Sequence, residues 1–132
     1  MSSDPLLKVN DLHVSFKLKS GDLPAVNGIS YHIDKGETLG VVGESGCGKS
    51  VSSFSILRLI SDPGYIKSGE ILFKGTDLLK LKEKEMRDYR GSKIAIIFQE
   101  PMTALNPVLT VGKQLNEPLI RHQKLSFKKL RS

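Results

Sequence analysis

The chain has 132 residues, enough for one domain, and its 39% hydrophobic and 26% charged residues are typical of a soluble globular protein. The sequence has no apolar stretch near the roughly 18 residues that a membrane span needs, and no secretion signal follows Met1, so we expect a cytoplasmic protein. Its single cysteine, Cys47, excludes an internal disulfide.

The net charge of +6 is concentrated in the second half of the chain. Residues 1–66 carry 6 Lys or Arg and 7 Asp or Glu, whereas residues 67–132 carry 14 and 7. A basic end suits either a nucleic acid or anionic membrane surface, or the solvated face of a helix. We favour the helix face and expect no nucleic acid partner, because the end beyond Lys113 holds only Phe127 for base stacking.

The pattern of the first half of the sequence predicts mainly strands and turns. Residues 6–16 alternate loosely between apolar and polar and predict a strand, and residues 20–24 predict a turn. A second, half-buried strand carries Ile29, Tyr31 and Ile33 on one face. Residues 34–37 predict a tight turn, and residues 38–42 a short apolar strand.

The remaining elements mix helices and strands. We expect a helix over residues 49–60, ended by Asp62-Pro63-Gly64, and a strand over residues 69–74, closed by Gly75. The later elements are a charged helix over 82–90 with Gly91 as its stop, a buried apolar strand over 93–98, a loop over 101–107 and a helix from about Val111. This order predicts an α/β fold with an antiparallel front layer.

A glycine-rich stretch matches the phosphate-binding P-loop, G-x-x-x-x-G-K-[ST], at every fixed position. It reads Gly43, Glu44, Ser45, Gly46, Cys47, Gly48, Lys49 and Ser50. In this motif the glycines let consecutive N–H groups face one anion, at the positive end of the following helix. Lys49 then contacts the β- and γ-phosphates, and the Ser50 hydroxyl is placed to bind Mg²⁺. We interpret Cys47 as a small loop residue, although its position favours thiolate formation.

The sequence around this loop resembles ABC ATPases, and specifically the oligopeptide and dipeptide importers. Residues 39–50 have the ABC form of the P-loop, and Ile96-Ile97-Phe98-Gln99-Glu100-Pro101 resembles the Q-loop of that family. The run over residues 102–112 is similar to that of the peptide importers, and Val51 after Ser50 supports the same branch. The resemblance covers residues 6–119.

The resemblance implies roles for individual residues and partners. Phe16 stands where the family places an aromatic ring on adenine, although a core strand phenylalanine is the alternative. Gln99 would contact the γ-phosphate, Mg²⁺ and the attacking water, and residues 100–107 would contact a membrane subunit. Lys49 and Gln99 are thus the candidate catalytic residues. The implied cofactors are ATP and Mg²⁺, and Val51 implies one phosphate contact fewer than usual.

Several parts of a complete ABC ATPase are not found in the sequence. It has no apolar strand ending in Asp-Glu (Walker B), no Leu-Ser-Gly-Gly-Gln signature and no switch histidine. We interpret His13, His32 and His122 as structural. The expectation is an N-terminal portion of a P-loop NTPase (ABC ATPase): residues 1–110 hold the RecA-like core with its antiparallel β layer, and residues 111–132 begin the helical subdomain. Such a portion alone should be catalytically inactive.

The expected setting is the cytoplasmic face of a bacterial or archaeal membrane. The implied partners are membrane-spanning permease subunits, a second ATP-binding subunit and, indirectly, an extracytoplasmic peptide-binding protein. Three alternatives stay open at this point: a non-catalytic nucleotide-binding module, the ATPase of a related importer of nickel or another solute, and a basic nucleic-acid-binding P-loop protein, which salt dependence would reveal.

Overall fold

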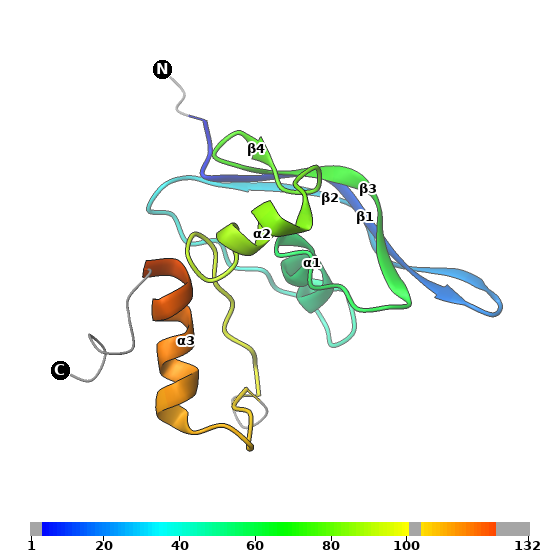
Figure 1. Cartoon of the computed structure of the whole chain (residues 1–132). Coiled ribbons are helices and arrows are strands. Elements are labelled where there is room, and N and C mark those ends of the chain that lie inside the picture. Colours follow the sequence, from blue (N-terminus) through cyan, green and yellow to red (C-terminus); the bar gives the residue numbers. More distant parts are fainter. Residues whose placement is uncertain (1–3, 101–103, 124–132) are drawn as a thin grey trace. The chain divides into compact units, whose positions relative to one another are not determined.

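The structure, a computed structural model, describes residues 4–100 and 104–123. The chain divides into two compact units, residues 1–82 and residues 83–132. The first unit contains the strands β1 (Leu7–Leu18), β2 (Gly21–Ile33), β3 (Gly64–Phe73) and β4 (Thr76–Asp77) and the helix α1 (Lys49–Ile56) (Figure 1). The second contains the helices α2 (Glu83–Tyr89) and α3 (Val111–Gln123).

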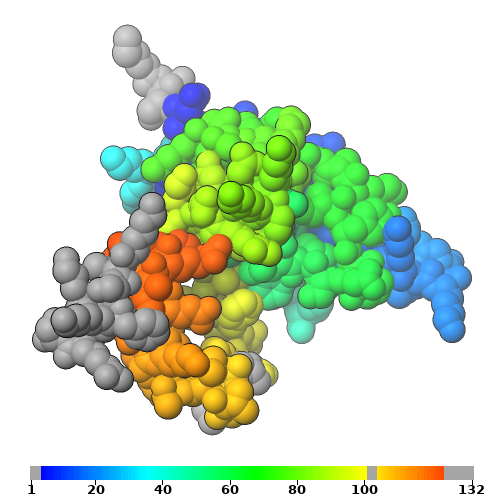
Figure 2. Space-filling model, viewed as in Figure 1, coloured from blue at the N-terminus to red at the C-terminus, as the bar shows by residue number. Residues whose placement is uncertain are grey.

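The four strands form one antiparallel sheet in the order β2-β1-β3-β4. Strand β1 lies between β2 and β3, so that Leu7 is opposite Ile33 on one side and Phe73 on the other. The β1–β2 hairpin, in blue, projects beyond the rest of its unit (Figures 1 and 2). The predicted antiparallel layer is therefore confirmed, and it is the main architectural element of the first unit.

A bulge in β1 explains why its apolar pattern alternates only loosely. Leu7 and Val9 are buried before the bulge, and Leu12 and Val14 are buried after it. Asp11 lies between them with a positive φ of 43°, where the register of both neighbouring strands shifts. One extra residue moves the side chains that follow to the opposite face, so the bulge keeps both apolar pairs in the core.

Two strand boundaries differ from those expected. The turn predicted over residues 20–24 is confined to residues 19–20, and β2 already begins at Gly21. Strand β3 begins at Gly64 rather than near residue 69, because its first half pairs with the far end of β1, where Phe16 is opposite Gly64. The turn at Gly75 leads into β4, which the sequence did not predict. The half-buried strand carrying Ile29, Tyr31 and Ile33 is confirmed as part of β2.

Helix α1 ends at Ile56, four residues before the predicted end. Arg58 has a left-handed backbone with a φ of 52°, and the Leu59 N–H donates to the Phe54 carbonyl (2.9 Å). The Arg58 N–H donates to the Ser55 carbonyl (3.0 Å), which completes a Schellman motif. Glycine usually occupies this left-handed position, and because arginine stands there instead, the sequence contains no signal for the end of the helix.

The two apolar runs predicted as strands, residues 38–42 and 93–98, are not strands in the structure. Val42 is 94% exposed and Ile97 is 98% exposed, and within the described residues only an isolated bridge between Arg90 and Ile94 involves either run. An apolar run forms a strand only where neighbouring strands supply hydrogen-bond partners to its backbone. The described strands all belong to the antiparallel sheet and do not pair with these runs.

The second unit confirms both predicted helices. Helix α2 ends one residue before the expected Arg90, and Gly91 follows it with a φ of 82°, as predicted for a stop. Within this unit the His122 ring lies so close to Gly91 that a Cβ there would be 3.1 Å from Nε2. Helix α3 begins at Val111, as expected. The predicted boundary near residue 110 coincides with this helix start and remains a prediction.

Candidate functional site

The glycine-rich loop of residues 43–50 connects an extended, exposed segment to helix α1. Gly46 and Gly48 both have a left-handed backbone, with φ values of 79° and 91°. Gly48 also lies directly against β2, because a Cβ on it would be 2.4 Å from the carbonyl oxygen of Ala25. The loop therefore curls as a P-loop requires, and its last glycine fixes the start of α1 on the sheet.

The Lys49 side chain closes this loop. Its Nζ donates hydrogen bonds to the carbonyl oxygens of Gly43 and Glu44, both at 2.6 Å, and lies 3.5 Å from the Cys47 sulfur. The Cys47 N–H donates to the Glu44 carbonyl (3.3 Å) and tightens the turn. The structure thus brings Lys49 together with the loop that the motif assigns to phosphate, with the ammonium inside the curve.

The start of α1 offers N–H groups and one exposed hydroxyl. The first intrahelical bond runs from the Ser52 N–H to the Gly48 carbonyl (2.8 Å), so Lys49, Ser50 and Val51 lie in the first turn, whose N–H groups have no partner within the helix. Ser50, the predicted Mg²⁺ ligand, is exposed and Val51 is half-buried. A bound anion could accept hydrogen bonds from these first-turn N–H groups, and the Ser50 hydroxyl could bind the cation that accompanies it.

Two buried serines fix α1 against the sheet. The Ser52 hydroxyl donates to the Lys49 carbonyl and the Ser55 hydroxyl to the Val51 carbonyl, both at 2.7 Å. Both side chains are nearly or fully buried, and these bonds satisfy them inside the helix. Their small size lets the helix pack on one face of the sheet, where α1 contacts β1 and β2 (Figure 1). The serines thereby hold the P-loop on a rigid base.

Two predicted site residues pack against glycines. The Cys47 thiol is exposed and lies over Gly43, where a Cβ would come within 2.5 Å of the sulfur. The half-buried Phe16 ring lies over Gly64 of β3, where a Cβ would be 2.7 Å from Cε1. One side of the Phe16 ring is therefore used in packing within the sheet, and its role towards adenine remains a prediction.

Gln99 belongs to the second unit and lies outside regular structure, where it is exposed. Residues 101–103 of the following loop lie outside the described residues, and so does most of the basic end, residues 124–132. Residues 104–110 form an irregular loop that leads into α3, as predicted. Thr110 caps this helix, because its Oγ1 accepts a hydrogen bond from the Lys113 N–H (3.3 Å).

Sequence reasoning missed Gln114, whose side chain ties this loop to α3. Its Oε1 accepts a hydrogen bond from the Asn106 N–H (2.8 Å), and its Nε2 donates to the carbonyls of Asn106 (3.0 Å) and Leu109 (2.9 Å). A glutamine early in an amphipathic helix is ordinarily a solvent-facing residue, so the sequence contained no signal for this contact. The contact fixes the loop that follows the predicted Q-loop glutamine.

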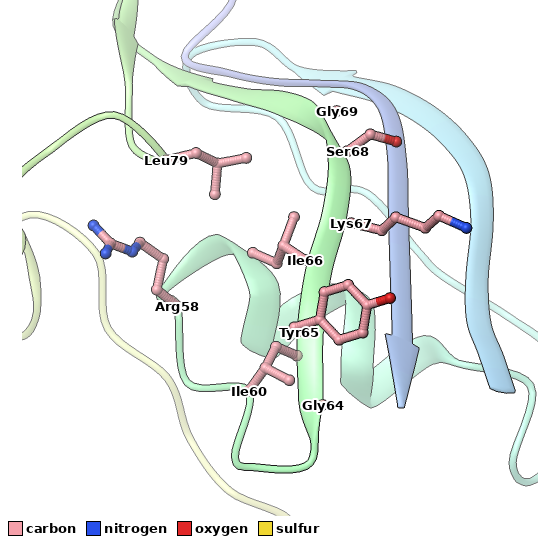
Figure 3. Close-up of a pocket in the computed structure, with 9 residues that line it drawn as sticks. All are labelled: Arg58, Ile60, Gly64, Tyr65, Ile66, Lys67, Ser68, Gly69 and Leu79. Carbon is pink, nitrogen blue, oxygen red and sulfur yellow. The ribbon is translucent and has the colours of Figure 1, made fainter. Parts of the chain in front are cut away.

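A cavity of about 440 Å³ lies elsewhere in the first unit, along β3 and the turn after α1 (Figure 3). The Arg58 guanidinium borders it and donates to the Leu81 carbonyl (2.7 Å). None of the predicted site residues lines this cavity. Its lining residues are Arg58, Ile60, Gly64, Tyr65, Ile66, Lys67, Ser68, Gly69 and Leu79.

No helix among residues 4–100 and 104–123 has the length and apolar character to cross a membrane. The same residues contain no group of three or more His, Cys, Asp or Glu side chains that could hold a metal ion. The Ser50 hydroxyl, which the sequence predicts as a Mg²⁺ ligand, is exposed beside the loop, where it could bind such an ion together with oxygens of a bound phosphate.

Known proteins with similar sequences include ATP-binding proteins of peptide transport. The oligopeptide transport ATP-binding protein OppD of Bacillus subtilis (strain 168) is 57% identical over 92% of this chain and 34% of its own length. The dipeptide transport ATP-binding protein DppD of the same organism is 54% identical over 97% of this chain and 38% of its own length. The chain thus spans about a third of these relatives, and the predicted resemblance to this branch is confirmed.

The fold comparison and the family model agree with this similarity. A dimeric post-hydrolysis state of the ATP-binding cassette MJ0796, bound to ADP and Pi, superposes with a TM-score of 0.80 and 25% identity over 95% of this chain and 52% of that one. The predicted fold class, an ABC ATPase core with an N-terminal antiparallel sheet, is confirmed for the half of the cassette that the chain covers. A family model described as ABC transporter matches residues 26–131, and the chain therefore belongs to the ABC transporter family.

Proposed function

We propose that this chain forms the nucleotide-binding front part of an ATP-binding subunit that couples ATP hydrolysis to the import of oligopeptides or dipeptides. The observation that carries the proposal is the curled loop of residues 43–50, with the Lys49 ammonium inside it and α1 starting at its end. The 57% identity to an oligopeptide transport ATP-binding protein supports peptides as the transported solute, ahead of nickel.

In this proposal the P-loop binds the phosphates of ATP. The Lys49 ammonium, which now bonds the carbonyls of Gly43 and Glu44, would exchange these for the β- and γ-phosphates. The first-turn N–H groups of α1 and the positive end of its dipole would add to the attraction. Hydrogen bonds to a charged group are worth roughly 1.5–3 kcal/mol each, so a few of them reach the roughly 8 kcal/mol of micromolar binding.

The other site residues would complete the nucleotide complex. Ser50 and Gln99 would contribute oxygen ligands to the Mg²⁺ ion, and Phe16 would stack on adenine with the side of its ring that does not pack on Gly64. Gln99 would also contact the γ-phosphate and the attacking water. Its amide both donates and accepts hydrogen bonds, which suits it to respond to the presence of that phosphate.

The proposed setting is the cytoplasmic face of a bacterial or archaeal membrane. Residues 100–107 would contact a permease subunit and transmit the nucleotide state to it, and a second ATP-binding subunit would complete the ATP site. The peptide-binding protein outside the cell would act on this complex indirectly. The dimeric form of the similar cassette MJ0796 supports pairing with a second ATP-binding subunit.

The proposal is tested with two substitutions in the assembled transporter. Gln99→Ala removes one hydrogen bond of about 1 kcal/mol, so ATP affinity should stay within about tenfold of the parent while peptide uptake falls sharply. Lys49→Ala removes a charge from the phosphate site and should weaken ATP binding more. Calorimetry and uptake into vesicles measure the two effects, and loss of ATP binding in Gln99→Ala but not in Lys49→Ala would contradict the assignment.

The chain of residues 1–132 gives a complementary test. It should bind ATP weakly and release phosphate only at the background rate, because the sequence contains no Walker B carboxylate to orient water. Phosphate release is measured for the parent chain and for Lys49→Ala. A robust turnover that depends on Lys49 would contradict this part of the proposal.

A further inference from the structure

The Gln114 amide uses all of its hydrogen-bonding groups on the loop of residues 104–110. Its oxygen accepts from the Asn106 N–H (2.8 Å), and its nitrogen donates to the Asn106 carbonyl (3.0 Å) and the Leu109 carbonyl (2.9 Å). One side chain on α3 therefore holds both backbone polar groups of Asn106, in the manner of a paired strand. A contact of this kind fixes the path of the loop.

Further bonds inside the loop complete the same arrangement. The Asn106 side chain accepts a hydrogen bond from the Val108 N–H (3.0 Å), which forms an Asx turn. The Leu109 N–H donates to the Asn106 carbonyl (3.2 Å), and the Gln114 N–H donates to the Thr110 carbonyl (3.2 Å). The loop is thus a compact turn attached to the first turns of α3, in which the Gln114 side chain is the link between the two.

The fixed loop exposes apolar side chains. Leu105 is 54% exposed and Val108 is 84% exposed, and on α3 Val111 and Leu115 are exposed four residues apart, on one face. In the space-filling view the loop and α3, coloured gold to orange-red, lie at the surface (Figure 2). Because the loop backbone bonds within its own unit, a partner could meet these side chains with little further ordering of the loop, which favours binding.

We propose that Gln114 is the positioning residue that holds this loop ready for the permease subunit. This inference rests on the proposed function, which assigns residues 100–107 to that contact. Gln114 touches neither the nucleotide nor the reacting atoms in this account. It acts through Asn106 and keeps Leu105 and Val108 in a fixed arrangement, so its loss should uncouple transport from ATP while leaving ATP affinity unchanged.

The first experiment measures amide hydrogen exchange in the chain of residues 1–132 by NMR. Gln114→Ala should speed exchange of the Asn106 N–H by about tenfold, while Gln123→Ala, the same change at an exposed position on the same helix, should not. At neutral pH the Gln114→Glu carboxylate can still accept from the Asn106 N–H, but it cannot donate to the Asn106 and Leu109 carbonyls and its charge repels their oxygens. Protection of the Asn106 N–H should therefore fall below that of the parent chain. Protection should return when acid protonates that carboxyl group, a rescue that a merely space-filling role would not show.

The second experiment measures ATP affinity and peptide-dependent ATP turnover in the assembled transporter. Gln114→Ala should keep the Kd for ATP within about twofold of the parent and lose most of the peptide-stimulated turnover, and Gln123→Ala should lose neither. Unchanged Asn106 exchange in Gln114→Ala would overturn the loop contact itself. Faster exchange with unchanged coupling would overturn the positioning role. A parent transporter that imports no peptide would overturn the proposed function and the positioning role together, while the exchange result would still decide the contact.

Discussion

The close approach of Gly48 to β2 makes a quantitative prediction about the base of the P-loop. A Cβ on Gly48 would be 2.4 Å from the Ala25 carbonyl oxygen, a separation that only a shift of the backbone could relieve. Gly46 has a similar left-handed φ, 79° against 91°, but a Cβ there would meet no heavy atom within 4 Å. Comparing alanine at Gly46 with alanine at Gly48 therefore separates the cost of backbone strain, which both share, from the cost of steric overlap, which only Gly48 has.

The magnitude follows from these two contributions. Alanine in a left-handed conformation costs roughly 1–2 kcal/mol, of which about 0.4–1 kcal/mol is offset by the smaller entropy of the unfolded chain. Gly46→Ala should thus lower the free energy of unfolding by about 1 kcal/mol. Gly48→Ala adds overlap with packed backbone, which typically costs about 1–3 kcal/mol, so its total should be about 2–4 kcal/mol.

Urea unfolding followed by far-UV circular dichroism measures both variants against the parent chain. The expected result is a lower midpoint for Gly48→Ala than for Gly46→Ala, with the dependence on urea concentration unchanged. Equal losses of free energy in the two variants would refute the reasoning, because they would show that α1 does not start in contact with the Ala25 carbonyl.

Three further predictions concern single side chains. Arg58→Ala should lower the free energy of unfolding by about 1.5–3 kcal/mol in urea titrations, because the hydrogen bond from the guanidinium to the Leu81 carbonyl is lost; an unchanged midpoint would contradict this. Mg-ATP should slow alkylation of Cys47, measured by mass spectrometry, because the exposed thiol lies within the loop; equal rates with and without nucleotide would count against that placement. The Tyr65 hydroxyl donates a hydrogen bond to Asp22, and this bond together with the negative charge of Asp22 raises the pKa of Tyr65. The contribution of this pair to stability is therefore complete below the ordinary tyrosine pKa and is lost as the pH rises through the raised pKa of Tyr65. In an alkaline absorbance titration Asp22→Asn should shift one tyrosine transition to lower pH, and an unshifted curve would exclude the interaction.

The parts of the fold that local sequence determines could be predicted from the sequence. The P-loop motif located the start of α1 at Lys49, and the cap at Thr110 agrees with the predicted start of α3 near Val111. Gly91 marked the end of α2, because a left-handed residue there favours glycine. In each case a single residue type is tied to a single backbone conformation.

The parts that depend on distant neighbours could not be predicted. The run of residues 38–42 is as apolar as a buried strand, but a strand also needs a partner, and partners are a property of the whole sheet. The early end of α1 depends on Arg58, whose guanidinium donates to the Leu81 carbonyl, 23 residues further along the chain. Gln114 likewise acquires its role only when the loop at Asn106 folds back onto α3.

The central claim, that residues 43–50 bind the phosphates of ATP through Lys49, is tested most directly by calorimetric titration of the chain of residues 1–132 with Mg-ATP. Lys49→Ala is the matched variant, because it removes the ammonium that bonds Gly43 and Glu44 and leaves the rest of the loop sequence intact. The account predicts weak but measurable binding by the parent chain and a loss of more than about tenfold in Lys49→Ala. Equal ATP affinity in the two proteins would contradict it.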